Sequence, residues 1–290
     1  MPPYFAMEIV KTIPELLLAK KKFATPPVLV PTMGALHDGH FALIHKARDI
    51  AGPNGVVVVS LFVNPIQFNN ASDLENYPST LEADLAACER LGVDLVFTPE
   101  TASLYAENRS VLISESSLSS KLCGATRPGH FDGVCTVVAK LFNLFTPIDA
   151  VFGKKDYQQL AIISRLVRDL NFPIIIHGVD TVREADGLAL SSRNVRLTPE
   201  HRKQAPGIYA ALKCAADRVT QGAVEPSVLL KLIQKQLSES APDARLDYLE
   251  CVDAATLQSI NQIDRKCVIA IAAFFGNVRL IDNIELTSQF

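Results

Sequence analysis

The sequence predicts an α/β protein built on a doubly wound parallel sheet, with a smaller α+β domain at its C-terminal end. Up to about residue 182, short apolar runs alternate with segments of helical periodicity, which is typical of parallel sheets covered by helices on both faces. Beyond that point, two helical segments are followed by three strand-like runs. A chain of 290 residues has room for two domains, which we place at 1–182 and 183–290.

In the first domain the strands are expected where short apolar runs are rich in β-branched residues. These runs are 27–30, 56–63, 94–98, 150–152 and 173–177. Helices are expected where apolar residues recur at helical spacing, at 40–50, 133–145 and 157–170. A capping box from Thr12 to Glu15 predicts an earlier helix that reaches Phe23. A second box from Ser79 to Glu82 predicts another, closed by a glycine at 92.

In the second domain, helices are expected at 200–219 and 226–238, and strands at 245–252, 267–275 and 278–285. Gly276 and Asn277 separate the last two strands and are a two-residue hairpin signal.

Composition narrows the class of protein. The formal net charge is −3 and no basic stripe is present, so we expect no nucleic-acid partner. The N-terminus lacks the order of a secretory signal, and no apolar stretch has the length of a membrane span, so a cytoplasmic protein in solution is expected. The six cysteines are scattered without a C-x-x-C pair, which favours reduced, mostly buried thiols over disulfides or zinc.

The segment from Pro31 to His40, PTMGALHDGH, carries the strongest chemical signal. It follows a predicted strand and opens a predicted helix; Gly34 permits a tight turn and Gly39 lets a ligand approach the backbone. His37 and His40 are three residues apart and should face the same side of the first helical turn. A helix N-terminus attracts anions, and two imidazoles there can donate hydrogen bonds to phosphate oxygens. The alternative is a structural turn with one capping histidine.

Two later segments offer polar groups at the ends of predicted strands, where ligands bind in open α/β sheets. Asn64 and Gln67 supply amides suited to hydroxyls and a carboxylate. Lys155 can neutralise a triphosphate, and Asp156 can cap a helix or hold a nucleotide hydroxyl. Each of these sets could also be an ordinary solvated loop.

Taken together, these motifs resemble a known family. An H-x-G-H motif after the first strand is the signature of the nucleotidyltransferase superfamily, and the fuller string resembles the pantothenate synthetase (pantoate–β-alanine ligase) branch. Further segments match that branch in the same order, namely 60–68, 127–134, 152–160, 182–194 and 280–284.

The resemblance implies a Rossmann-like first domain that binds nucleotide and pantoate, and a second domain that closes over it as a lid. It implies ATP-dependent condensation of pantoate with β-alanine through a pantoyl adenylate, giving pantothenate, AMP and pyrophosphate. Mg²⁺ is expected to bridge phosphate oxygens, with no protein residue assigned as its ligand. The partners implied are these small molecules and a second copy of the chain in a homodimer.

The resemblance also implies roles for individual residues. It implies that the phosphates are bound, and their developing charge stabilised, by His37, His40, Lys155, Ser192 and Arg193. It implies that the rest of the nucleotide contacts Met33, Gly34, Gly153, Asp156, Val182, Leu190 and Ser191. It implies that pantoate contacts Gln67 and Gln159, with Asn64 and Arg127 as further candidates. Lys154 departs from the family, which usually has glutamate at that position.

Asp84 is expected on a helix surface, with an outer-sphere contact to the metal as the alternative. Two other functions remain open. One is another H-x-G-H enzyme, which transfers AMP or CMP to a phosphorylated acceptor and ignores β-alanine. The other is a nucleotide- or nucleic-acid-binding regulator without catalysis, which the presence of both histidines, Lys155 and Arg193 argues against.

Overall fold

The computed structural model describes residues 7–220 and 225–287 and forms two compact units. The first contains the chain up to Glu115 together with Pro128–Lys154 and Ile162–Asp180. The second contains Ser116–Arg127, Lys155–Ala161 and the chain from Thr181 onward. The functional division at 182 stays a prediction, and two short segments of the second unit come before that residue in the chain.

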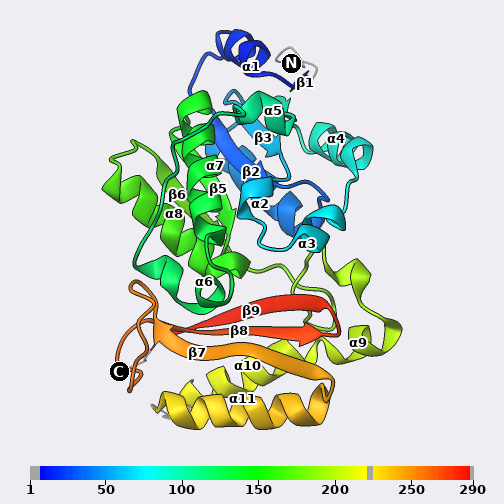
Figure 1. Cartoon of the computed structure of the whole chain (residues 1–290), viewed down its shortest axis with the longest axis vertical. Helices are drawn as coiled ribbons and strands as arrows, with labels where there is room; N and C mark the ends of the chain where they lie inside the picture. The colour runs from blue at the N-terminus through cyan, green and yellow to red at the C-terminus, as the bar shows by residue number, and fades with distance from the viewer. Residues whose placement is uncertain (1–6, 221–224, 288–290) are drawn as a thin grey trace. The chain divides into compact units, whose positions relative to one another are not determined.

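The first unit is built on a six-stranded parallel sheet with the order β1-β4-β3-β2-β5-β6 (Figure 1). Its strands are β1 (Glu8–Val10), β2 (Val28–Thr32), β3 (Val57–Leu61), β4 (Leu95–Phe97), β5 (Asp149–Gly153) and β6 (Ile175–Val179). Successive residues of β3 are all buried, although they point to opposite faces, so helices cover the sheet on both sides. The doubly wound fold is therefore confirmed. Strand order reverses at β2, which makes the carboxyl ends of β2 and β5 the expected ligand-binding edge.

The main helices beside this sheet are α1 (Ile13–Lys20), α2 (Asp38–Ala51), α4 (Leu81–Arg90) and α7 (His130–Phe145). Shorter elements are η1 (Pro65–Gln67), α3 (Ala71–Glu75) and α5 (Thr101–Leu104). α8 (Tyr157–Asp169) begins in the second unit and ends in the first. Leu43, Ile44 and Ala47 of α2 pack against alternate valines of the strands, which holds the helix against β2 and β5.

The two predicted capping boxes had different outcomes. The box at Thr12 is confirmed, since Thr12 and Glu15 exchange side-chain-to-backbone hydrogen bonds, but the helix ends at Lys20 rather than Phe23. The box from Ser79 to Glu82 was wrong. Thr80 is the N-cap residue there, and its hydroxyl donates to Asp84 Oδ1 at 3.0 Å instead of capping the helix.

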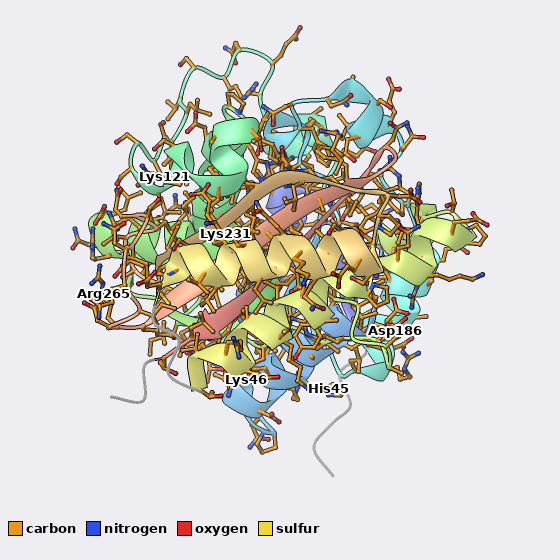
Figure 2. The ribbon with its side chains drawn as sticks, turned by 90° about the horizontal axis from the view of Figure 1, so that it is seen from below. His45, Lys46, Lys121, Asp186, Lys231 and Arg265 are labelled. Atoms are coloured by element: carbon orange, nitrogen blue, oxygen red, sulfur yellow. The ribbon has the colours of Figure 1, made fainter. Side chains whose placement is uncertain are left out.

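The second unit contains an antiparallel sheet of three strands, β7 (Ala244–Asp253), β8 (Cys267–Phe275) and β9 (Val278–Leu286). The predicted hairpin is confirmed, with Gly276 at a φ of 58°. α10 (Gly207–Thr220) and α11 (Pro226–Ser240) run side by side and cover the sheet, as Figure 2 shows with Lys231 on α11. The single helix predicted at 200–219 was wrong, because Pro206 separates α9 (Pro199–Gln204) from α10.

The remaining elements of this unit are short. They are η2 (Leu118–Ser120), α6 (Leu122–Thr126) and η4 (Asn194–Arg196), while η3 (Lys154–Asp156) joins β5 to α8. All six cysteines are free, and five of them are buried. Within the described ranges, no helix combines the length and the apolar character needed to cross a membrane.

Candidate active site

The loop between β2 and α2 is held in an unusual backbone conformation by a buried carboxylate. Gly34 and Ala35 both have positive φ, of 78° and 50°. Asp84 accepts the backbone N–H of Ala35 at 2.8 Å and that of Leu36 at 2.9 Å. Asp84 is only 3% exposed, so its placement on a helix surface was wrong. By accepting both N–H groups, the carboxylate holds the loop in this conformation. It thereby fixes the backbone that leads into His37 and His40.

His37 and His40 form a capping box at the start of α2. His37 Nδ1 accepts from the backbone N–H of Gly39 at 3.2 Å, and His40 Nδ1 accepts from that of His37 at 3.3 Å. Their ring centroids are 4.2 Å apart. A nitrogen that accepts an N–H carries no proton, so this geometry places the hydrogen of each neutral ring on Nε2. Each ring therefore carries an Nε2–H donor at the helix N-terminus, and each caps the helix through Nδ1.

Asn64 and Gln67 lie at the carboxyl end of β3 and are both buried. Gln67 Nε2 lies 3.1 Å from Met33 Sδ, which joins this turn to the loop after β2. Asn64 donates to Gln67 Oε1 at 2.9 Å and to the Gly133 carbonyl at 3.1 Å, and it accepts from Tyr105 Oη at 2.9 Å. Burial raises the pKa of Tyr105, partly offset by a nearby arginine, so the phenol remains a donor. Asn64 thus orients Gln67.

The start of α7 supports the same turn. A Cβ at Gly133 would lie 2.6 Å from the Ile66 carbonyl oxygen and 2.7 Å from the Gln67 nitrogen, so only glycine permits this approach. His130 is 8% exposed, and its Nδ1 lies 2.7 Å from the Gln67 carbonyl oxygen, which makes Nδ1 the donor. No role for His130 was predicted from the sequence, although the residue follows Pro-Gly at the start of α7.

Lys154, the residue that departs from the family pattern, follows the end of β5 and has an acidic neighbour. Gly153 is the last residue of β5, next to β6 in the sheet. Lys154 follows and forms an ion pair with Asp180 at 2.7 Å, although the aspartate is 89% exposed. A glutamate at position 154 would repel the Asp180 carboxylate, whereas the positive charge of Lys154 attracts it.

In the second unit, Lys155 and the two glutamines that follow the η3 turn differ in surroundings. Lys155 Nζ lies 3.9 Å from Asp156 Oδ2, and the lysine side chain is 19% exposed. Gln158 is buried, and its amide donates to the carbonyls of Leu118 and Lys121. Gln159 is half-buried, which makes it the better candidate of the two glutamines for contact with a ligand.

The segment from Val182 to Leu190 folds back on itself before the predicted phosphate loop. Leu190 N donates to the Val182 carbonyl at 3.0 Å. In the loop itself, Arg193 N donates to Ser191 Oγ at 3.3 Å, and Asn194 N donates to the Ser191 carbonyl at 3.0 Å. These bonds form a tight turn that presents the Ser192 and Arg193 positions between two fixed ends.

The structure thus brings predicted residues together within each unit. In the first unit, Met33, Gln67 and Asn64 are connected, and Met33 leads through Gly34 to the two histidines. In the second unit, Lys155 and Ser191 line one small pocket, together with Leu188, Ala189, Ile208, Tyr209, Leu280, Ile281 and Asp282. Arg127 is partly exposed and ends α6 in the second unit.

Comparison with known proteins identifies relatives over nearly the whole chain. Residues 8–285 match the family model described as pantoate-beta-alanine ligase. The pantothenate synthetase of Akkermansia muciniphila is 58% identical over 259 residues, which cover 89% of this chain and 92% of the relative. That of Thermotoga petrophila is 45% identical over 286 residues, which cover 97% and 100%.

Solved structures give the same result. The crystal structure of pantothenate synthetase from Thermus thermophilus has a TM-score of 0.91 and 43% identity, and covers 97% of this chain and 100% of that one. The pantoate-beta-alanine ligase of Francisella tularensis, complexed with beta-gamma ATP and beta-alanine, has a TM-score of 0.79 and 35% identity, with coverage of 96% and 97%.

Proposed function

This chain belongs to the pantoate–β-alanine ligase family, whose ATP-dependent reaction yields pantothenate, AMP and pyrophosphate, and we propose that His37 and His40 carry its first step. In that step a pantoate carboxylate oxygen attacks the α-phosphorus of ATP. The bond from that phosphorus to the pyrophosphate oxygen breaks, and negative charge grows on the phosphate oxygens. Two Nε2–H groups at the N-terminus of α2 suit that charge. The single supporting observation is that each Nδ1 accepts a backbone N–H.

In the second step the neutral amine of β-alanine attacks the acyl carbon of pantoyl adenylate. The new C–N bond replaces the C–O bond to AMP, and the surplus proton of the amine leaves to water. This step needs positioning more than covalent help, because the adenylate is already an activated acyl group. Exclusion of water protects that adenylate from hydrolysis.

We further propose that the other predicted residues complete the site. Lys155, Ser192 and Arg193 neutralise and grip the phosphates. Gln67 and Gln159 bind pantoate, with Arg127 nearby, and Asn64 acts through Gln67, since its amide donates to the Gln67 oxygen. The remaining nucleotide contacts are assigned to Met33, Gly34, Gly153, Asp156, Val182, Leu190 and Ser191. The roles of 1–182 as substrate-binding domain and 183–290 as lid belong to the same proposal.

ATP, pantoate and β-alanine are the proposed substrates, and the Francisella tularensis relative was crystallised with two ligands of this kind. In the part of the chain that the structure describes, no three His, Cys, Asp or Glu side chains gather in a metal-binding group. Mg²⁺ remains part of the proposal as an ion that would bind together with ATP and offset the charge of its phosphates, with no residue of this chain assigned to hold it. The protein is proposed to act as a homodimer in the cytoplasm.

A His37→Asn variant tests the role of the histidines. Asparagine is a good N-cap residue and can accept the same backbone N–H, but it offers no donor where Nε2–H lies. We expect pantoate-dependent pyrophosphate release to fall roughly 10²–10³-fold, as when an oxyanion donor is removed. The thermal stability of His37→Asn should stay near that of the parent protein. A His37→Ala variant should instead lose both pyrophosphate release and thermal stability, because alanine neither donates nor caps the helix.

The controls separate this ligase from its rivals. AMP release should require both pantoate and β-alanine and should equal the pantothenate formed. If the His37→Asn variant releases pyrophosphate at the wild-type rate, the proposed role of His37 is wrong. Pyrophosphate release that ignores both acids would direct the search to a phosphorylated nucleotidyl acceptor, the reaction of other H-x-G-H enzymes.

A further inference from the structure

Asp282 and Asn283 are consecutive residues of β9, and both are buried, with exposures of 4% and 7%. Buried carboxylates and amides are costly unless they are hydrogen-bonded, so their partners indicate what they are for. Asn283 N donates to Asp282 Oδ1 at 2.8 Å, which links the two. Successive side chains leave a strand on opposite faces, which lets one dipeptide reach two separate segments.

Asp282 holds the segment that leads into the phosphate loop. Arg183 donates to both Asp282 carboxylate oxygens, at 2.6 and 2.9 Å, in a bidentate ion pair. The same guanidinium lies 3.5 Å from the centroid of the Tyr209 ring and donates to the Gly187 carbonyl at 3.2 Å. A Cβ at Gly187 would lie 2.9 Å from that ring, so the turn is packed directly on it. The residues just before Ser191 are therefore fixed to β9.

Asn283 holds the other phosphate-binding segment. Its Nδ2 donates to the Lys155 carbonyl at 2.9 Å. This bond fixes the backbone from which the lysine side chain extends. Lys155 and Ser191 also line the same small pocket as Asp282, so both segments lie close to the dipeptide.

We propose that Asp282 and Asn283 are positioning residues that set the spacing between Lys155 and the Ser191–Arg193 loop, so that both grip one triphosphate. The inference rests on the proposed roles of Lys155, Ser192 and Arg193. The Leu280–Ile284 segment, which has no direct part in the reaction steps above, thereby gains a positioning role. In this proposal each of the two residues acts through the group that it holds, Asp282 through the Arg183 side chain and Asn283 through the Lys155 backbone.

The test compares Asn283→Ala and Asp282→Asn with Glu285→Gln. Glu285 lies on the same strand, and its ion pair with Lys266 is 2.6 Å long and half exposed at the lysine, so it is a matched control. Misplacement by about 1 Å can cost around 100-fold in rate, so we expect kcat for pantoyl-adenylate formation to fall roughly 10–100-fold in both variants. The KM for β-alanine should stay within about twofold, since that amine enters after the triphosphate has reacted.

A double variant distinguishes positioning from simple loss of stability. Asn283→Ala should slow single-turnover adenylation in the parent protein but have little further effect in a Lys155→Ala background, because the positioned amine is already gone. Equal fold losses in the two backgrounds, or Asn283→Ala and Asp282→Asn rates that match those of Glu285→Gln, would overturn the inference. If Lys155→Ala and Arg193→Ala leave adenylation intact, the proposed phosphate roles fail instead.

Discussion

Asp84→Asn tests how much of the catalytic geometry depends on one buried carboxylate. Oδ2 accepts the N–H of Ala35, while Oδ1 accepts both the N–H of Leu36 and the Thr80 hydroxyl. An asparagine has one acceptor oxygen and one NH₂ group. In either orientation of its amide, that NH₂ faces at least one backbone N–H, so a donor meets a donor and one hydrogen bond is lost.

The expected destabilisation follows from the three bonds. Hydrogen bonds to a charged group contribute about 1.5–3 kcal/mol each, and a buried unsatisfied donor costs about 1–3 kcal/mol. With one bond lost and two weakened, we expect the free energy of unfolding to fall by roughly 3–4 kcal/mol. That is a large share of the about 5–15 kcal/mol that stabilises a typical domain. The loop from Gly34 to Leu36 would then relax from its left-handed conformation.

The assay is urea unfolding together with pantoate-dependent pyrophosphate release. We expect adenylation to fall roughly 100-fold, because His37 and His40 follow the loop directly and lose their placement. Glu82→Gln is the matched control, since it removes an exposed carboxylate from the same first turn of α4. Asp84→Asn rates and stability equal to those of Glu82→Gln would refute the assignment of Asp84 as the anchor of this loop.

Two further perturbations test the packing and the charges. Gly133→Ala would place a methyl group within 2.6 Å of a carbonyl of the η1 turn, and should cost about 1–3 kcal/mol and raise the KM for pantoate several-fold, as denaturation and kinetics can show. Burial would raise the pKa of Asp253, but hydrogen bonds from Thr256 and Arg265 outweigh it and hold the pKa at about 2. The ionised Asp253 carboxylate therefore stabilises the fold above the ordinary carboxyl pKa of about 3.9, and this stabilisation should be lost as pH falls towards about 2. The free energy of unfolding of an Asp253→Asn variant should not show this loss between the two pH values.

The sequence was most informative where the determining contacts are local. The strand, turn and helix around His37 and His40 were predicted because glycine, histidine and the helical repeat all act within ten residues. The Gly276 hairpin was predicted for the same reason. At Pro206 the prediction of one continuous helix was wrong, because proline interrupts the backbone hydrogen bonds, and the α9 segment before it has no buried residue to extend the apolar face of α10.

The supports of the site were not predictable from local pattern. Asp84 contacts a loop almost fifty residues earlier in the chain, and its place in an acidic first helical turn is also what a surface residue shows. Arg183 and Asp282 are still farther apart in sequence. Nothing in the spacing of such residues indicates pairing, because tertiary packing decides it. Family resemblance suggested the contacts to substrate but not the residues that hold those candidates in place.

The spacing of the H-x-G-H motif has a physical reason in this structure. In an ordinary capping box, the N-cap side chain and the side chain three residues later accept each other's backbone N–H groups. Here both positions are histidines, and each uses Nδ1 for the cap. A serine or glutamate would satisfy the backbone but offer no imidazole N–H, whereas a lysine would offer charge but no acceptor. Histidine caps the helix, fixes its own tautomer and leaves Nε2 as an imidazole donor, so one pair of side chains serves both the fold and the proposed chemistry.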